Sequence, residues 1–245
     1  MSSSPSSTTT NDFAKALKAL HKPGRPLIVP NVWDAPSLYA VASLNDNGGG
    51  GEKRPVAAVA TASWALAHAR GAADEDLTAE QNLAADSIPA AGYGRGLEGS
   101  LYSKADAVAR VRAALGAAAA AGVPDFVVNA RCDVFRLDDA PGLDDATRMR
   151  EALDRGRAYL AAGATTVFFW GGGARGLSTA EVRTLVAELG GRVAVLLTKR
   201  DGALSTAELA DIGVARISVG PSLYLAAMNA VKTNAAQILG GGGLI

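Results

Sequence analysis

Apolar runs typical of buried β-strands alternate with helix-like segments along most of this chain. The strand-like runs are Leu27–Asn31, Val56–Ser63, Phe126–Arg131, Thr166–Trp170, Val193–Leu197 and Arg216–Gly220. Helical crossovers of this kind join parallel strands, because neighbouring parallel strands cannot be linked by a tight turn. The alternation therefore predicts an α/β fold, either a (β/α)8 barrel or a doubly wound sheet. A length of 245 residues favours the barrel.

Signals for helix starts and stops support this order of elements. Three Ser or Thr residues stand three positions before a Glu or Gln, namely Ser178 with Glu181, Ser205 with Glu208 and Thr78 with Gln81. This spacing lets a side chain and a backbone group satisfy each other in the first turn of a helix. Gly163 follows a segment with apolar residues at helical spacing and predicts the end of that helix.

The composition restricts the class of protein. Lys plus Arg and Asp plus Glu number 24 each, so the chain has no basic excess of the kind that binds nucleic acid or acidic lipid. No apolar run reaches the length of a membrane span. The single Cys132 excludes an intramolecular disulfide and fits a reducing compartment. We therefore expect a cytoplasmic protein with neither a membrane nor a nucleic-acid partner.

The chain is expected to form one domain. Residues 1–11 are rich in Ser and Thr and predict a flexible tail. Residues 12–239 hold the strand-like and helix-like segments and predict a single barrel domain. Residues 240–245 predict a second flexible tail.

Polar or glycine-rich residues follow nearly every strand-like run. They are Asn31–Asp34, Thr61–Trp64, Asn129–Asp133, Gly171–Gly173 and Gly220–Ser222. The active site of a parallel barrel forms where the strands end and the following loops begin. We therefore expect Asn31, Ser63, Arg131, Gly171 and Gly220 to surround one binding site. At any single strand end an ordinary polar loop is the alternative, and the glycines from Gly171 to Gly176 lack the spacing and the Lys of a P-loop.

Five segments of the chain, in this order, resemble motifs of the isocitrate lyase/phosphoenolpyruvate mutase superfamily. They are Pro30–Ala35, Ala60–Ser63, Gly71–Asp74, Asn129–Phe135 and Glu208–Pro221. The resemblance implies a (β/α)8 barrel, commonly tetrameric, whose last helix is exchanged between neighbouring subunits. It also implies a Mg²⁺-dependent enzyme that makes or breaks C–C or P–C bonds in small α-keto or hydroxy acids through an enolate-type intermediate.

The same resemblance assigns substrate-binding roles. Arg131 corresponds to the family's carboxylate-binding arginine, and its planar fork suits a substrate carboxylate. Ser63, with the backbone amides of Trp64 and Ala65, corresponds to the cradle for the keto-acid oxygens, although Ala65 replaces a glycine of the family. A fixed guanidinium and a divalent cation are both suited to the negative charge of an enolate.

Two more residues complete the candidate site. Asn129 is assigned to substrate binding with Arg131, and Asp74 resembles the catalytic acid of the family's flexible loop. Each assignment has a structural alternative. Arg131 could instead form an ion pair with Asp133, and Asp74 could be a solvated acid in an acidic run.

The metal ligands depart from the family pattern. Ile88 and Ala90 occupy the positions of the acidic pair that normally precedes a Gly-Tyr-Gly motif. Glu98 is retained from a later Leu-Glu-Asp, and Asp86 lies two positions too early to replace a ligand cleanly. Mg²⁺ is usually held by one or two carboxylates together with waters or substrate oxygens. We therefore expect Glu98 and Asp86 to bind Mg²⁺ only weakly.

A crossover is also missing from this region. The Gly-Tyr-Gly at residues 92–94 is followed almost at once by Glu98, whereas a crossover between parallel strands needs a dozen or more residues. Either the barrel is gapped around its third and fourth strands, or the sequence is a translation that skips a coding segment.

The leading functional hypothesis is a Mg²⁺-dependent lyase or mutase, with weakened catalysis, that acts on a small α-keto or hydroxy carboxylate as a homo-oligomer. The alternative is a non-catalytic barrel that keeps the ligand pocket or only the oligomer interface. A third hypothesis is a phosphosugar-type barrel enzyme that uses the loop after Gly171. Among the strand ends, only Lys199 would supply a lysine for Schiff-base chemistry.

Overall fold

A computed structural model describes residues 8–46, 54–61, 63–69, 93–139, 141–172 and 175–243. The chain divides into two compact units. The first comprises Met1–Leu27 and Asp86–Ile217, and the second comprises Ile28–Ala85 and Ser218–Ile245. Two of the three boundaries between them fall within the strands β1 (Leu27–Val29) and β7 (Arg216–Ser218).

Parallel strands form the core of the first unit. β4 (Asn129–Cys132) pairs with β5 (Thr166–Phe169), which pairs with β6 (Val193–Leu196), and all three run parallel. The sheet continues in the order β1-β7-β6-β5-β4. Val167 and Val193 are fully buried, as expected for strands with helices packed against the sheet.

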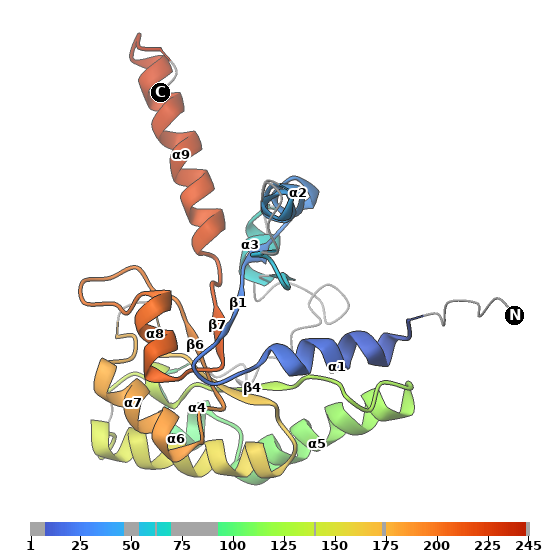
Figure 1. The fold of residues 1–245 in the computed structure, drawn as a ribbon. Helices are drawn as coiled ribbons and strands as arrows, with labels where there is room; N and C mark the ends of the chain where they lie inside the picture. The colour runs from blue at the N-terminus through green and yellow to red at the C-terminus, as the bar shows by residue number, and fades with distance from the viewer. Residues whose placement is uncertain are drawn as a thin grey trace, which may run out of the picture. The chain divides into compact units, whose positions relative to one another are not determined.

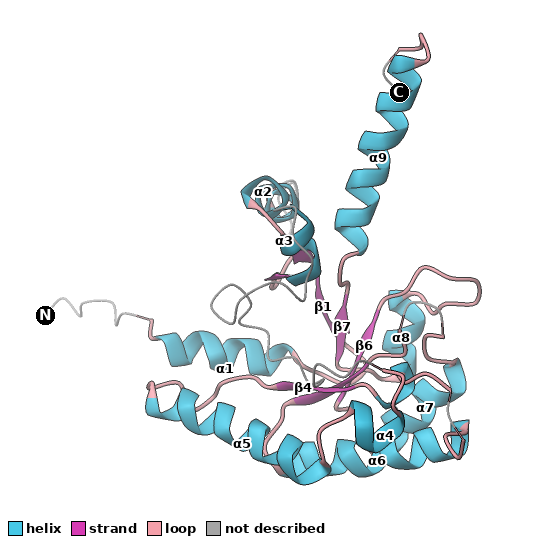
Figure 2. Ribbon diagram, turned by 180° about the vertical axis from the view of Figure 1, so that it is seen from behind, coloured by secondary structure: helices cyan, strands magenta, loops and turns pink. Residues whose placement is uncertain are grey.

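Helices cover this sheet in the first unit. They are α1 (Thr10–Leu20), α4 (Gly96–Ser100), α5 (Lys104–Ala120), α6 (Asp145–Ala161), α7 (Thr179–Glu188) and α8 (Thr206–Ile212). Figures 1 and 2 show α5, α6 and α7 along one side of the strands, and α6 contacts both β4 and β5. Gly156 permits this close packing, because a Cβ there would lie 2.9 Å from a methyl carbon of Leu189 and 3.3 Å from the ring of Phe169.

Two of the three predicted capping pairs are confirmed. At the start of α7, the Ser178 hydroxyl accepts a hydrogen bond from the Glu181 N–H, and the Glu181 carboxylate accepts one from the Ser178 N–H. Ser205 and Glu208 form the same arrangement at the start of α8. The third pair, Thr78 with Gln81, lies outside the described residues. The predicted stop is also confirmed, because α6 ends at Ala161 and Gly163 follows with a φ of +106°.

A buried arginine fixes the segment that follows β4. Arg148 of α6 has a side chain that is 2% exposed. Its Nη1 donates to the carbonyl oxygens of Val134 at 3.0 Å and Leu137 at 2.8 Å, and its Nη2 donates to the Asp139 carboxylate at 3.0 Å. A short 3-10 turn, Val134–Arg136, follows β4. Arg148 of α6 therefore holds a carbonyl of this turn and the carbonyl of Leu137, the residue after it.

The described part of the second unit contains a pair of short strands with helices. β2 (Asn31–Val32) pairs in parallel with β3 (Ala60–Thr61). The helical segments are α2 (Ala35–Ala42), a 3-10 turn at Ser43–Asn45, α3 (Ser63–Ala69) and α9 (Ser222–Leu239). The Asp34 side chain caps α2 by accepting a hydrogen bond from the Ser37 N–H at 2.7 Å.

The predicted α/β class with parallel strands is confirmed, but several strand limits differ. The predicted strand Leu27–Asn31 is interrupted at Pro30, which has no N–H to donate to a sheet. The predicted run Phe126–Arg131 becomes a strand only at Asn129, and the Phe126 side chain is 45% exposed. Of the described residues in the run Val56–Ser63, only Ala60–Thr61 form a strand.

The predicted gap between the third and fourth barrel strands falls partly on residues outside the described ranges, so it stays a prediction. Residues 93–139 are described, and Gly96–Ser100, which includes the retained Leu97 and Glu98, forms the helix α4 rather than a strand. The pairings of the described strands form a five-stranded sheet and a separate pair. The predicted domain limits also stay predictions. None of the helices in the described ranges combines the length and apolar character that are needed to cross a membrane.

Candidate active site

Arg131 lies near the carboxyl end of β4 and forms a buried ion pair. Its Nε lies 2.8 Å from each carboxylate oxygen of Asp133. The Asp133 side chain has no exposed surface, whereas 28% of the Arg131 side chain is exposed. The ion pair that the sequence suggested is therefore present. The Asp133 carboxylate holds one edge of the Arg131 guanidinium, while part of the Arg131 side chain stays in contact with solvent.

Two aromatic residues surround the same guanidinium. The Tyr93 hydroxyl accepts a hydrogen bond from Nη2 of Arg131 at 3.1 Å. The Cζ of Arg131 lies 4.6 Å from the centroid of the Trp170 ring, within range of a cation–π interaction. The two rings meet edge to face with their centroids 6.1 Å apart. Arg131 is thus fixed by a carboxylate, a hydroxyl and an aromatic face before any ligand binds.

A second arginine, Arg136, packs against the ring of Tyr93. The Cζ of Arg136 lies 4.1 Å from the centroid of the Tyr93 ring, and its Nη1 lies 3.1 Å from an Asp138 oxygen. The Asp138 N–H in turn donates to the Tyr93 carbonyl at 3.1 Å. Tyr93 therefore contacts both arginines. An acidic ligand would meet two guanidinium groups at this end of β4.

Tyr93 and Trp170 are two residues of the site that were not predicted from the sequence. Both carried a signal, because Tyr93 is the tyrosine of the retained Gly-Tyr-Gly and Trp170 directly follows β5. Asn129, which was assigned, starts β4 and faces the same side as Arg131 by strand alternation. Its Oδ1 accepts a hydrogen bond from the Thr166 hydroxyl at 2.7 Å. Its role in substrate binding stays a prediction.

The predicted amide cradle lies at the start of a helix in the second unit. Ser63, Trp64 and Ala65 form the first turn of α3, where backbone N–H groups have no partner within the helix. Such N–H groups are suited to oxygen atoms that carry negative charge. Ala65 is fully buried. Because Arg131 belongs to the first unit, the joint action of the cradle and Arg131 stays a prediction.

Other predicted strand ends meet within the second unit. The Asn31 side chain donates from Nδ2 to the Thr61 carbonyl at 3.0 Å and accepts from the Gly220 N–H at 2.8 Å. The Trp33 and Tyr224 rings lie edge to face, with their centroids 5.3 Å apart. A single amide at the start of β2 therefore joins the end of β3 to the turn before α9, and Asn31 and Gly220 lie together as predicted.

The metal ligands proposed from the sequence receive no support from the described residues. Asp74 and Asp86 lie outside those residues. Glu98 is exposed in the five-residue helix α4. In the described ranges, no three His, Cys, Asp or Glu side chains come together. Of the proposed ligands, the described residues therefore supply Glu98 alone, and a single carboxylate would hold Mg²⁺ only weakly.

Cys132, next to Arg131, is a buried strand residue rather than a reactive thiol. Its side chain points away from Arg131 by strand alternation and is only 2% exposed. Burial raises the pKa of the Cys132 thiol to about 12. The thiol is therefore protonated at neutral pH, and a protonated thiol is a poor nucleophile.

Comparisons with known proteins were consistent across sequence and structure. The family model described as phosphoenolpyruvate phosphomutase matches residues 17–91 and 93–239. A candidate phosphonomutase from Burkholderia cenocepacia J2315 is 33% identical with a TM-score of 0.71, over 96% of this chain and 100% of that chain. A candidate lyase/mutase from the same organism is 26% identical with a TM-score of 0.68, over 93% of this chain and 88% of that chain.

More distant structures share the fold. A 2,3-dimethylmalate lyase, described as a member of the PEP mutase/isocitrate lyase superfamily, is 23% identical with a TM-score of 0.62. The match covers 92% of this chain and 84% of that chain. No protein in the curated set matches.

Proposed function

Because this chain belongs to the phosphoenolpyruvate phosphomutase family, we propose that it binds a small α-keto or hydroxy carboxylic acid and acts as a C–C or P–C bond lyase or mutase. The observation that carries the proposal is the fixed guanidinium of Arg131. Asp133, Tyr93 and Trp170 hold it at the end of a buried strand while 28% of its side chain stays exposed. A carboxylate ligand would need no rearrangement of this arginine.

The chemistry of the proposed reaction explains why a fixed cation is useful. When a C–C or P–C bond breaks at the carbon next to a keto group and that carbon keeps the electron pair, the negative charge spreads onto the keto oxygen as an enolate. Preorganised donors stabilise such charge without reorganising during the reaction. Arg131 would hold the substrate carboxylate. The N–H groups at the start of α3 would bind the keto-acid oxygens, and Asp74 would act as the loop acid. These assignments follow from the resemblance and remain proposals.

Mg²⁺ is the cofactor that the family implies, but this sequence departs from the family at the positions of the metal ligands. By the resemblance, Ile88 and Ala90 stand at the acidic positions, and the exposed Glu98 belongs to no group of three potential ligands among the described residues. We therefore propose weak Mg²⁺ binding and weakened catalysis. The combination of a retained Arg131 site with lost acidic residues favours a second candidate function, a non-catalytic barrel that still binds the carboxylic acid.

Replacing Arg131 by Lys is expected to weaken carboxylate binding. Lys keeps the positive charge but loses the planar fork that can hold two oxygens and contact Asp133 at the same time. One lost charge-assisted hydrogen bond, at about 1.5–3 kcal/mol, corresponds to roughly tenfold weaker binding or more. Calorimetric titration with pyruvate and with oxalate measures this change, and Arg150→Lys on the exposed face of α6 is the control. Equal affinities of wild type and Arg131→Lys would refute the role of Arg131.

We also propose a homo-oligomer that is held through α9. This helix of 18 residues has no buried residue. Met228, Val231 and Ile238 are 41%, 62% and 48% exposed and recur at helical spacing, so they form one apolar stripe. Such a stripe is stabilised when another helix covers it.

The oligomer can be tested with two matched substitutions on α9. Val231→Asp places a charge on the apolar stripe, and Thr233→Asp places the same charge two residues away, off the stripe. We expect light scattering to give an oligomeric mass for wild type and Thr233→Asp, and a smaller mass for Val231→Asp. A wild-type protein that is monomeric at the concentrations used would contradict the proposal.

A further inference from the structure

Arg200, in the segment after β6, differs from the other arginines near the carboxyl ends of the strands. Each of the others has a carboxylate partner: Arg131 pairs with Asp133, Arg136 with Asp138 and Arg175 with Glu181. No salt bridge among the described residues involves Arg200. Its positive charge is therefore not balanced by a carboxylate in that part of the chain.

The guanidinium of Arg200 is held in place but incompletely paired. Its Nη2 donates to the Leu177 carbonyl at 2.5 Å. Its Nε is buried and has no hydrogen-bond partner within the described residues. A buried donor of a charged group that lacks an acceptor is unfavourable, because the group has lost water without gaining a replacement. An acceptor supplied by a ligand would remove this penalty.

Glycines bring the backbone close to this guanidinium. A Cβ at Gly176, where φ is +63°, would lie 2.6 Å from Nε of Arg200. A Cβ at Gly171 would lie 2.1 Å from the Gly176 carbonyl oxygen, and the Gly176 N–H donates to the Gly171 carbonyl at 3.0 Å. Larger residues at either position would displace Arg200 or open the turn.

A pocket lies beside Arg200. Its cavity volume is about 30 Å³, and its lining includes Trp170, Thr198 and Arg200 together with the two glycines. Apolar residues from β6, α7 and α8, such as Val195, Val182 and Leu209, complete the lining. A pocket of this size, largely apolar with a few polar groups, has room for one small acidic group rather than for a whole organic ligand.

We propose that this pocket binds the acidic group of a small organic anion, whether carboxylate, phosphonate or phosphate, through Arg200. Arginine is suited to such groups because its N–H donors match two oxygens at once. Trp170 links the pocket to the site described above, since its ring also contacts Arg131. The anion is then either the second acidic group of the ligand held by Arg131 or a separate small anion. This proposal concerns binding alone and stands whether or not the chain is a lyase or mutase.

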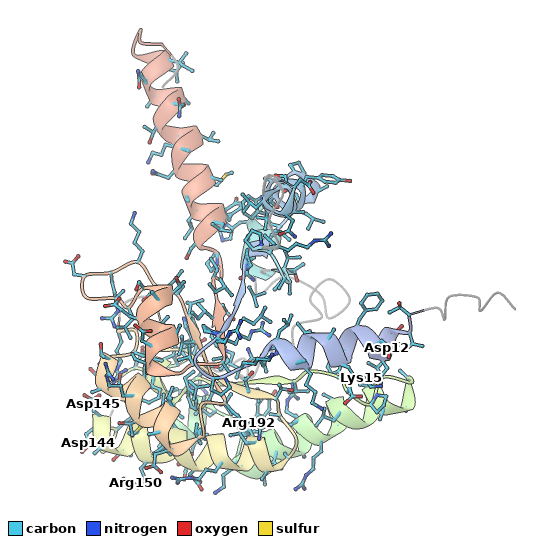
Figure 3. All side chains as sticks on the ribbon, viewed as in Figure 1. Asp12, Lys15, Asp144, Asp145, Arg150 and Arg192 are labelled. Carbon is cyan, nitrogen blue, oxygen red and sulfur yellow. The ribbon has the colours of Figure 1, made fainter. Side chains whose placement is uncertain are left out.

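Calorimetric titration of the full chain with inorganic phosphate tests the site. We expect Arg200→Gln and Arg200→Lys to bind phosphate roughly tenfold more weakly than wild type, because both lose the fork. The matched control is Arg192→Gln. Arg192 precedes β6, donates to the carbonyls of Ala164 and Thr165, and is labelled in Figure 3. Arg192→Gln removes side-chain hydrogen bonds to backbone carbonyls, as the Arg200 substitutions do. It should nevertheless leave phosphate affinity unchanged.

A measurement on the wild-type protein complements the variants. Phosphate binding should change the fluorescence of Trp170, and Trp170→Phe should abolish that change while Trp33 and Trp64 still emit. Phosphate affinity that is equal in wild type and both Arg200 variants would overturn the proposal. So would a fluorescence change that persists in Trp170→Phe.

Two acids distinguish the sources of the anion. If the pocket holds the second acidic group of the Arg131 ligand, Arg200→Gln should weaken binding of the diacid oxaloacetate and leave the monoacid pyruvate unaffected. If the pocket holds a separate anion, Arg200→Gln should weaken phosphate alone, and Arg131→Lys should leave phosphate affinity unchanged.

Discussion

Replacing Asp133 by Asn is expected to destabilise the protein and to weaken carboxylate binding together. The Asp133 side chain has no exposed surface, and both of its oxygens contact Arg131. Removing one partner of a buried ion pair leaves the other charge without compensation. We expect a loss of about 3 kcal/mol in the free energy of unfolding, at the lower end of the range for such pairs because Arg131 keeps some contact with water.

The measurement is a thermal melt with and without oxalate. A loss of this size in a chain of this length corresponds to a fall in Tm of roughly 6–12 °C. Oxalate should stabilise Asp133→Asn less than wild type, because Arg131 would no longer be held in the orientation that a carboxylate needs.

Arg136 and Asp138 provide a matched control within the same segment. They have the same spacing along the chain as Arg131 and Asp133, but the Asp138 side chain is 61% exposed. Exposed ion pairs contribute about 1 kcal/mol or less, so Asp138→Asn should lower Tm by less than roughly 4 °C. Similar losses in the two variants would mean that burial does not distinguish these pairs and that Arg131 is not held as we infer.

Local features of the fold could be predicted because they depend on neighbouring residues. The capping pairs at Ser178 and Ser205 involve side chains three positions apart, and the apolar run from Phe126 predicted a strand that contains Arg131, although β4 begins only at Asn129. The ion pair of Arg131 with Asp133 was also within reach, since only two positions separate them. Each of these contacts is determined by a short segment of sequence.

Contacts between distant residues were not predictable in the same way. Tyr93 meets Arg131 across 38 positions, and Arg200 meets the Leu177 carbonyl across 23. These contacts depend on which strands are neighbours and on how the loops after them turn. The residue pattern suggests the neighbours but not the paths of the loops. For the same reason, the aromatic contacts of Arg131 and the pocket beside Arg200 became evident only from the structure.

The second large effect that we expect concerns the metal. As written, the chain should bind Mg²⁺ weakly and turn over isocitrate-like or oxaloacetate-like substrates poorly or not at all, because Ile88 and Ala90 replace the acidic pair of the family. A Mg²⁺ ion bound through one carboxylate keeps most of its waters and gains little from the protein. The expected result is a shallow calorimetric titration with Mg²⁺ and no loss of residual activity on addition of EDTA.

The double substitution Ile88→Asp with Ala90→Asp should reverse this defect in part. Two added carboxylates supply direct oxygen ligands and negative charge, so we expect Mg²⁺ to bind more tightly by about tenfold or more. Ile88→Asn with Ala90→Asn is the control, because it adds polar side chains of similar size without charge. Inserting in addition a crossover of the length that the family has here should restore Mg²⁺-dependent turnover, if the predicted gap is present. The prediction would be wrong if the unaltered chain cleaved C–C bonds efficiently and EDTA abolished this activity. Other carboxylates of the chain would then hold the metal.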